Sequence, residues 1–350
     1  MAGRARFLLL LGEHNAAGPA PRRSAAAARG GSGAGRPRGS PAPQERPSGA
    51  RRGAPGCQKY RRVRYNFTMS ANSAGLSGRT FLVTGANTGI GRATAADLAR
   101  QGGKVFVACR SAEKGRAAAA EITAATGNSD VLFLPLDLAD LASVRRCVAE
   151  FLARGEPLHV LINNAGVGGA RGITKDGFEL AFGINHLGHF ALTTALLDCL
   201  AASAPARVVT VASDSHYQAK GIDFEAVRRP TASRTGLREY AVSKLSNVLF
   251  SQELARRTAG RGITAYALHP GVVASDIWRR VPWPVRPLMT MRMLSTEQGA
   301  ATSLYCATAP ELADVTGRFY DNCREREPSA VATPELAGTL WERSEAWTAA

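Results

Sequence analysis

The sequence predicts an α/β fold in which one sheet of about seven parallel strands is covered by helices on both faces. Six near-continuous apolar runs alternate with segments of helical length, as expected for parallel strands that are buried on both sides. A glycine-rich turn, "TGANTGIG", stands between the first apolar run and the first helical segment. Together these features predict a single doubly wound, Rossmann-type domain.

The repeating pattern places each element in order along the chain. Strands are expected at 80–85, 104–110, 130–138, 158–166, 206–213 and 263–271, with a short seventh at 317–321. Helices are expected at 91–102, 113–127, 140–155, 177–203 and 239–260. Glycines stand where four of these helices should end, at Gly102, Gly127, Gly155 and Gly260.

The charge of the chain is concentrated near its beginning. Residues 1–70 hold 13 Arg and one Lys against two Glu, whereas the other 280 residues carry 30 basic and 26 acidic side chains. The Ala-, Gly-, Pro- and Arg-rich composition cannot bury enough apolar surface to offset ordering entropy. We therefore expect a disordered arm at 1–70 and one folded domain at 76–345, and we expect no nucleic-acid partner for that domain.

Cysteines and the apolar run near the beginning of the chain indicate little about function. The six cysteines are scattered, with no CxxC pair, which is typical of small buried hydrophobes in a reducing compartment. The apolar run at 7–12 is too short to span a bilayer, so no transmembrane helix is expected there. The Arg-rich, acid-poor arm leaves mitochondrial targeting open as an alternative to a cytoplasmic location.

The glycine-rich turn predicts a phosphate-binding site. Gly85 and Gly89 would leave room for the turn or for a pyrophosphate, and Gly91 would let the helix approach the sheet. The N-terminus of the following helix presents N–H groups and a partial positive charge to an anion. This combination favours a dinucleotide cofactor.

The ends of the next strands indicate which dinucleotide is bound. Arg110 ends the second strand, where a guanidinium can bind the 2′-phosphate of NADP and an Asp would select NAD; Arg92 is a weaker candidate for that phosphate. Asp137, after the third strand, could accept from the adenine amino group or could cap the following helix. "NNAG" at 163–166 ends the fourth strand, where a cofactor would cross the sheet.

Further motifs follow in a fixed order: Asn185 in "GINHLGHF", Ser213 at a strand end, "YAVSK" with Tyr240 and Lys244 one helical turn apart, and "HPG" at 269–271. With the glycine-rich turn and NNAG, this series resembles the short-chain dehydrogenase/reductase superfamily over about residues 76–345. The resemblance implies that the domain is catalytic and binds NADP(H). The cofactor contacts that it implies are Gly85, Asn87, Thr88, Gly89, Ile90, Gly91, Arg110, Asp137, Leu138, Asn164, Ala165, Gly166, Tyr240, Lys244, Pro270 and Gly271.

The resemblance also implies the roles of the catalytic residues. Tyr240 would donate a proton to the alkoxide that hydride transfer to a carbonyl leaves. Lys244 and the cationic nicotinamide of the oxidised cofactor would together lower the pKa of that phenol. Ser213 would hold the substrate oxygen near Tyr240. Asn185 would support a water relay from Lys244 to solvent. No metal site is expected.

Segments such as "NHLGHFALT", "YALHPGVV" and "TGRFYDNC" narrow the resemblance to the retinol dehydrogenase branch, whose members prefer NADP(H) and act on retinal. The family location would be the endoplasmic reticulum or another intracellular membrane surface. The segment 274–294 mixes Trp and Met with Arg, which favours an apolar substrate such as retinal or a lipid aldehyde and suits peripheral membrane contact. A homodimer is a further hypothesis. A steroid or small-carbonyl reductase of the same fold, and a non-catalytic cofactor-binding interaction protein, are the alternatives.

Overall fold

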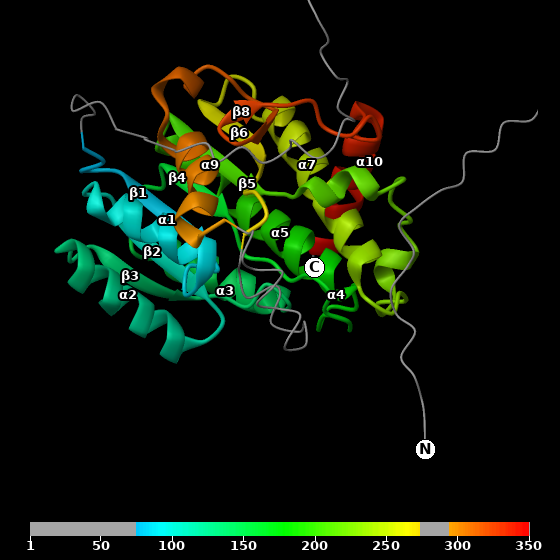
Figure 1. Cartoon of the computed structure of the whole chain (residues 1–350), viewed down its shortest axis with the longest axis horizontal. Coiled ribbons are helices and arrows are strands. Elements are labelled where there is room, and N and C mark those ends of the chain that lie inside the picture. The colour runs from blue at the N-terminus through cyan, green and yellow to red at the C-terminus, as the bar shows by residue number, and fades with distance from the viewer. Residues whose placement is uncertain (1–74, 274–293, 350) are drawn as a thin grey trace, which may run out of the picture. The chain divides into compact units, whose positions relative to one another are not determined.

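One sheet of eight strands organises the part of the chain that the structure, a computed structural model, describes, namely residues 75–273 and 294–349 (Figure 1). The strand order is β3-β2-β1-β4-β5-β6-β7-β8. Neighbouring strands from β3 to β7 are parallel, and only β8 pairs antiparallel, with β7. The strand bounds are β1 Thr80–Thr84, β2 Lys104–Cys109, β3 Val131–Pro135, β4 Val160–Asn163, β5 Ala206–Val211, β6 Ile263–His269, β7 Arg318–Asp321 and β8 Arg324–Glu325.

Two helical layers bury the sheet from both sides. Alternate strand residues contribute to two separate clusters, so Val83 packs in one and Leu82 in the other. The first cluster includes residues of α1 (Gly89–Arg100), α2 (Ala112–Thr126) and α9 (Thr296–Thr308). The second includes residues of α3 (Leu141–Leu152), α5 (Gly188–Ala195) and α7 (Leu237–Arg257). This burial on both faces explains why the strands read as continuous apolar runs.

The predicted fold class is confirmed, and all seven predicted strands are present. The four glycines expected at helix ends all have positive φ, between 63° and 88°. Among the described residues, the elements that were not predicted include the two-residue strand β8 and the α-helices α9 and α10 (Pro334–Thr348). A strand of two exposed residues leaves no apolar run to detect.

The helix predicted over 177–203 is wrong as a single element. The structure has α4 (Leu180–Phe182), a π-helical turn at Gly183–Leu187, then α5 and α6 (Leu197–Ala202). A Cβ at Gly188 would lie 2.6 Å from the carbonyl oxygen of Leu138, so the glycine lets α5 approach that loop closely. π-turns of this kind are rare and occur often at functional sites.

Helix α7 is buried on both of its sides. One side packs on β5 and β6 and the other on α10, and 13 of its 21 residues are buried. Trp341 of α10 stacks on Phe250 of α7 at 5.9 Å between ring centroids, and Arg257 lies 4.8 Å from the Trp341 ring. The C-terminal helix therefore holds α7 against the sheet.

The five cysteines in the described ranges, Cys109, Cys147, Cys199, Cys306 and Cys323, are free thiols, in agreement with their interpretation as isolated small side chains. Burial raises the pKa of the Cys147 thiol to about 12. The arm predicted at 1–70, and hence the predicted domain boundary, lies outside the described residues. None of the helices in the described ranges has the length and apolar content that crossing a membrane requires.

Two buried histidines should make the fold sensitive to acid. Burial lowers the pKa of His186 to about 3 and that of His189 to about 4, so both are neutral in the native protein. The unfolded chain binds their protons below about pH 6.5. The free energy of unfolding should therefore fall as pH drops below about 6.5, by about 1.4 kcal/mol per pH unit for each histidine down to its native pKa.

Chemical denaturation of the protein and of His186→Gln between pH 7.5 and 5 would check this expectation. Glutamine can still bond Ser344, which lies 2.9 Å from His186 Nε2, but it does not titrate. In the variant, the free energy of unfolding should depend less steeply on pH, by the contribution of one titrating histidine. An unchanged pH dependence would contradict the assignment.

Candidate active site

The carboxyl ends of β1, β4, β5 and β6 bring the predicted site residues to one edge of the sheet. β1 lies beside β4, and from this pair the chain order runs outward in opposite directions. Such a switch point is where doubly wound sheets bind their ligands. Gly85 follows β1, Asn164 follows β4, Ala212 and Ser213 follow β5, and Pro270 follows β6.

The glycines of the first turn make room for the NNAG segment. Gly85 has φ +67°, and a Cβ there would lie 2.9 Å from the Cα of Ala165. A Cβ at Gly91 would lie 2.4 Å from the side-chain nitrogen of Asn164 and 2.6 Å from the oxygen of Gly85. Gly91 therefore accommodates an amide side chain, a more specific role than the expected close approach of helix and sheet. Gly89 has φ +58°, a conformation that favours glycine.

The Thr84 hydroxyl connects this turn to two other segments. It accepts hydrogen bonds from the backbone N–H groups of Asn164 and Ala165, both at 2.9 Å. The Asn164 side chain donates in turn to the Thr84 carbonyl at 2.7 Å. The same hydroxyl lies 2.8 Å from Nε2 of His189. Thr84 is thus shared by the glycine-rich turn, NNAG and α5.

His189 continues this chain of hydrogen bonds to Asn185. Its Nδ1 lies 2.9 Å from the Asn185 carbonyl, which only accepts, so Nδ1 carries the proton. Nε2 then accepts from the Thr84 hydroxyl. Neither Thr84 nor His189 was predicted from the sequence as a site residue. The four-residue spacing of Asn185 and His189 was a usable signal, because it places both on one helical face.

The N-terminus of α1 is suited to a phosphate. No side chain caps it, and its first turn holds no acidic residue. By contrast, Ser111 caps α2, Asp140 caps α3 and Ser295 caps α9. The predicted contacts Asn87, Gly89 and Ile90 are half-buried here, and Thr88 is exposed. The residues present therefore fit the pyrophosphate of a dinucleotide.

The residues predicted to select the cofactor lie after β2 and β3. Arg110 is exposed directly after β2. Arg92 forms an ion pair with Glu121 at 2.7 Å, so its charge is already engaged.

Asp137 is half-buried and accepts from the N–H of Ala139 at 3.0 Å. The capping alternative for Asp137 is wrong because Asp140 caps α3; Leu138 is buried under α5.

Asn185 lies in the π-turn and is fully buried. Its side-chain oxygen accepts from the N–H of Val167 at 2.8 Å. Its side-chain nitrogen donates to the Val167 carbonyl at 3.0 Å and to the Ser243 hydroxyl at 2.9 Å. A Cβ at Gly166 would lie 3.3 Å from the Asn185 oxygen and 3.5 Å from Nζ of Lys244. The π-turn therefore brings Asn185 beside NNAG and the lysine.

The structure brings Ser213, Tyr240 and Lys244 together. Ser213 lies close enough to Tyr240 to influence the pKa of its phenol, the Ser213 hydroxyl donates to that of Ser215 at 3.3 Å, and Nζ of Lys244 lies 5.6 Å from the centre of the Tyr240 ring. Tyr240 and Ser213 are half-buried, so a substrate can reach them. Gly236, which has φ +66°, is the N-cap residue of α7. A Cβ at this position would lie 2.7 Å from the carbonyl oxygen of Ala170, so the glycine lets the first turn of α7, which carries Tyr240, lie close to the loop after β4.

Burial shifts the pKa values of two residues of this trio. Burial raises the pKa of Tyr240, and the nearby Ser213 hydroxyl offsets part of that rise. Lys244 is not among the causes that shift this pKa in the protein chain, and its lowering by Lys244 together with an oxidised nicotinamide stays a prediction. Burial also lowers the pKa of Lys244 to about 7, which weakens the positive charge that would stabilise tyrosinate. Lys244 donates to the carbonyl of Val211 at 2.8 Å, and the side chain of Asn247 donates to the same oxygen at 3.1 Å.

The end of β6 closes the site on its far side. Pro270 and Gly271 are half-buried, and Gly271 has φ +84°. Val273 forms a parallel bridge with Leu294. The segment 274–294, which the sequence analysis associates with an apolar substrate, lies outside the described residues except for Leu294. Among the residues that the structure does describe, no cluster of His, Cys, Asp and Glu could hold a metal.

Comparison with known proteins identifies the family. The family model for short chain dehydrogenase matches residues 79–283. Dehydrogenase/reductase SDR family member 13 of Homo sapiens is 44% identical over 81% of this chain and 78% of its own length. Retinol dehydrogenase 12 of Mus musculus is 46% identical over 77% of this chain and 86% of its own length.

A solved structure described as the Pseudomonas aeruginosa RhlG/NADP active-site complex is also similar, with a TM-score of 0.57 and 26% identity, over 74% of this chain and 98% of its own. The family model spans more than half of this chain, and the two sequence relatives each match more than two thirds of it. The chain belongs to the short-chain dehydrogenase family and to its retinol dehydrogenase branch.

Proposed function

We propose that the chain is an NADP(H)-dependent oxidoreductase that interconverts an apolar alcohol and its aldehyde or ketone, with Tyr240 as the general acid and base. The observation that carries this proposal is the contact between Ser213 and Tyr240 beside the buried Lys244. A hydroxyl that can hold a carbonyl oxygen, a phenol that can protonate it and an amine one turn away meet the needs of carbonyl reduction.

The cofactor would lie across the carboxyl ends of β1 and β4. The first turn of α1 would hold its pyrophosphate, and Asn164 to Gly166 would lie beneath it. Pro270, Gly271 and Lys244 would contact its nicotinamide end. When bound, a reduced nicotinamide cofactor supplies the hydride. The similar solved structure contains NADP, which supports this cofactor class.

The protein's own side chains would then transfer one proton to the substrate oxygen. Ser213 donates a hydrogen bond to the substrate oxygen and keeps it within reach of the Tyr240 hydroxyl. Tyr240 transfers its proton to that oxygen as negative charge develops there. Lys244, protonated in part at neutral pH, stabilises the resulting tyrosinate, and Asn185 lies beside it for proton exchange with solvent.

Exposed apolar side chains support an apolar substrate. Leu237 is 53% exposed and precedes Tyr240 by one turn, and Val272, 44% exposed, follows Gly271. Ile173, 45% exposed, belongs to the loop after β4 that also contacts Gly236. A similar protein carries the name retinol dehydrogenase, so we propose retinol/retinal or a related lipid aldehyde as the substrate pair. Peripheral membrane contact and a homodimer remain predictions.

Replacing Tyr240 with Phe should remove the proton donor and leave the fold intact. Turnover should fall by about 10²–10⁴-fold, the usual contribution of a general acid. The measurement is steady-state reduction of retinal, with NADPH binding followed by fluorescence. Tyr305→Phe, in α9, is the matched control and should behave as the unmodified protein. Near-normal turnover of Tyr240→Phe would exclude the mechanism.

Replacing Arg110 with Asp should reverse the cofactor preference. A charge-assisted bond to the 2′-phosphate contributes about 1.5–3 kcal/mol, so the unmodified protein should favour NADPH over NADH by at least about tenfold. Dissociation constants of both cofactors would be compared in Arg110→Asp and Arg92→Ala. Arg92 already pairs with Glu121, so its variant should keep the preference. Equal affinity of the unmodified protein for both cofactors would refute the assignment.

The substrate class can be tested with a panel of carbonyl compounds of increasing apolar surface. Each Å² of apolar surface removed from water is worth about 25 cal/mol, so kcat/KM should rise from short aldehydes to retinal. A preference for small polar carbonyls would overturn the retinoid proposal. Absence of turnover with the whole panel and both cofactors would favour a non-catalytic role.

A further inference from the structure

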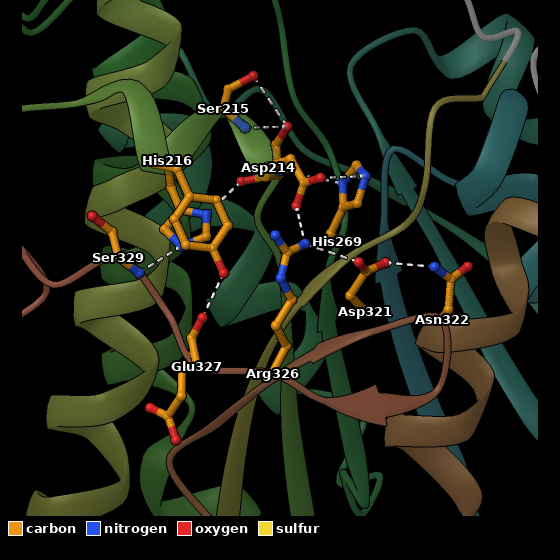
Figure 2. Close-up of polar contacts among 11 residues, drawn as sticks. Asp214, Ser215, His216, His269, Asp321, Asn322, Arg326, Glu327 and Ser329 are labelled. Carbon is orange, nitrogen blue, oxygen red and sulfur yellow. Dashed lines mark hydrogen bonds and ion pairs between the residues drawn. The ribbon is translucent and has the colours of Figure 1, made fainter. Parts of the chain in front are cut away.

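The turn that carries Ser213 is held by a segment more than a hundred residues later in the chain. Ser213 precedes a 3₁₀ turn at Asp214–Gln218, and its own hydroxyl accepts from the N–H of Ser215 at 3.2 Å. Residues 326–329, after β8, lie against this turn, as Figure 2 shows for His216 and Ser329 and for Asp214 and Arg326. We call 326–329 the C-terminal strap.

His216 is the link between the strap and Ser213. Its side chain is fully buried, and its ring centre lies 3.9 Å from that of Tyr217 and 4.8 Å from that of Phe319. Nδ1 lies 2.7 Å from the carbonyl oxygen of Ser213. Nε2 lies 3.1 Å from the backbone nitrogen of Ser329.

These two partners define the proton position on the ring. A carbonyl only accepts and a backbone N–H only donates, so Nδ1 carries the proton and Nε2 accepts. A protonated His216 would direct a second N–H at that of Ser329. Burial lowers the pKa of His216, which favours the neutral ring that this arrangement requires.

Two further contacts fix the strap itself. Arg326 bridges Asp214 and Asp321, with Nη1 at 3.0 Å from a carboxylate oxygen of each, and its guanidinium lies 4.8 Å from the centre of the Tyr217 ring. The Tyr217 hydroxyl donates to the carbonyl of Glu327. None of these contacts involves His216: Asp214 and Tyr217 connect the strap to the turn, and Asp321 connects it to β7.

We propose that His216 is a positioning residue. Its side chain spans the distance between the strap and the turn and holds the Ser213 carbonyl, and it thereby orients the Ser213 hydroxyl toward the substrate oxygen. This inference rests on the proposed role of Ser213. It assigns His216 no contact with substrate or cofactor. Its bond to Ser213 matters for turnover, and its bond to Ser329 matters mainly for stability.

Two nearly isosteric variants separate these bonds. In His216→Asn the amide nitrogen can take the place of Nδ1 and still donate to Ser213, whereas the bond to Ser329 is lost. In His216→Gln the amide oxygen can take the place of Nε2 and still accept from Ser329, whereas the side-chain bond to Ser213 is lost and only the backbone N–H of residue 216, at 3.0 Å, still donates to that carbonyl. Neither side chain titrates.

The measurements are kcat, KM and NADPH affinity with retinal as substrate, and the melting temperature. His216→Gln should lose about ten- to a hundredfold in kcat, because a misplaced catalytic group costs about that much, with NADPH affinity unchanged. His216→Asn should keep kcat within about threefold by the same reasoning. Tyr217→Phe, which removes only the bond to Glu327, is the control and should lower the melting temperature without lowering kcat.

Equal kcat for the Asn and Gln variants would overturn the proposal. If Ser213→Ala retains turnover, the proposed function of Ser213 fails instead, and the two failures are thereby distinguished. Nitrogen NMR of the histidine rings in the unmodified protein supplies a test that needs no variant to fold. A neutral His216 with the proton on Nδ1 supports the proposal, and a proton on Nε2 would refute it.

Discussion

The hydroxyl of Thr84 is the interaction on which the site depends most widely. It accepts from two consecutive backbone N–H groups of NNAG and donates to His189, so one oxygen atom fixes β1, the end of β4 and α5 relative to each other. The packing of Gly91 against the Asn164 amide is possible only because Asn164 is held there by the Thr84 backbone as well. A valine of similar volume would remove this acceptor from the Ala165 N–H, at a cost of about 1–3 kcal/mol, whereas the Asn164 N–H would keep its bond of 3.0 Å to the Ile162 carbonyl.

The second constraint is the burial of Lys244. A lysine that is almost fully buried must find acceptors, and the carbonyl of Val211 at the end of β5 is one of them. This contact holds α7 at a fixed height above the sheet, and α10 presses on α7 from the other side. The position of Tyr240 follows from that height, since it lies one turn before the lysine on the same helical face. The C-terminal helix thus takes part in the geometry of the site through its packing on α7.

The fold and the candidate site could be predicted from the sequence to different extents. The parallel strands were visible because burial on both faces turns each into an apolar run, and the helix ends were visible because only glycine adopts their backbone conformation readily. The approach of Ser213, Tyr240 and Lys244 was implied by the ordered motifs. The π-turn at Asn185 was not visible, because no periodic pattern marks it and the turn depends on contacts with Leu138 and Val167. The strap and Arg326 were not visible either, because ion pairs between distant segments leave no periodic pattern.

His189 and His216 use the same chemistry at two places in the site. In each, Nδ1–H donates to a backbone carbonyl three or four residues earlier, that of Asn185 or Ser213, while Nε2 accepts from another segment. Lysine and arginine only donate and carboxylates only accept, whereas a neutral imidazole does both at opposite ends of a rigid ring. The ring can do so only while it remains neutral, and burial is what lowers the pKa of both histidines. Burial of these rings costs stability in acid. It also keeps the rings neutral, and only neutral rings can order the segments that carry Asn185 and Ser213.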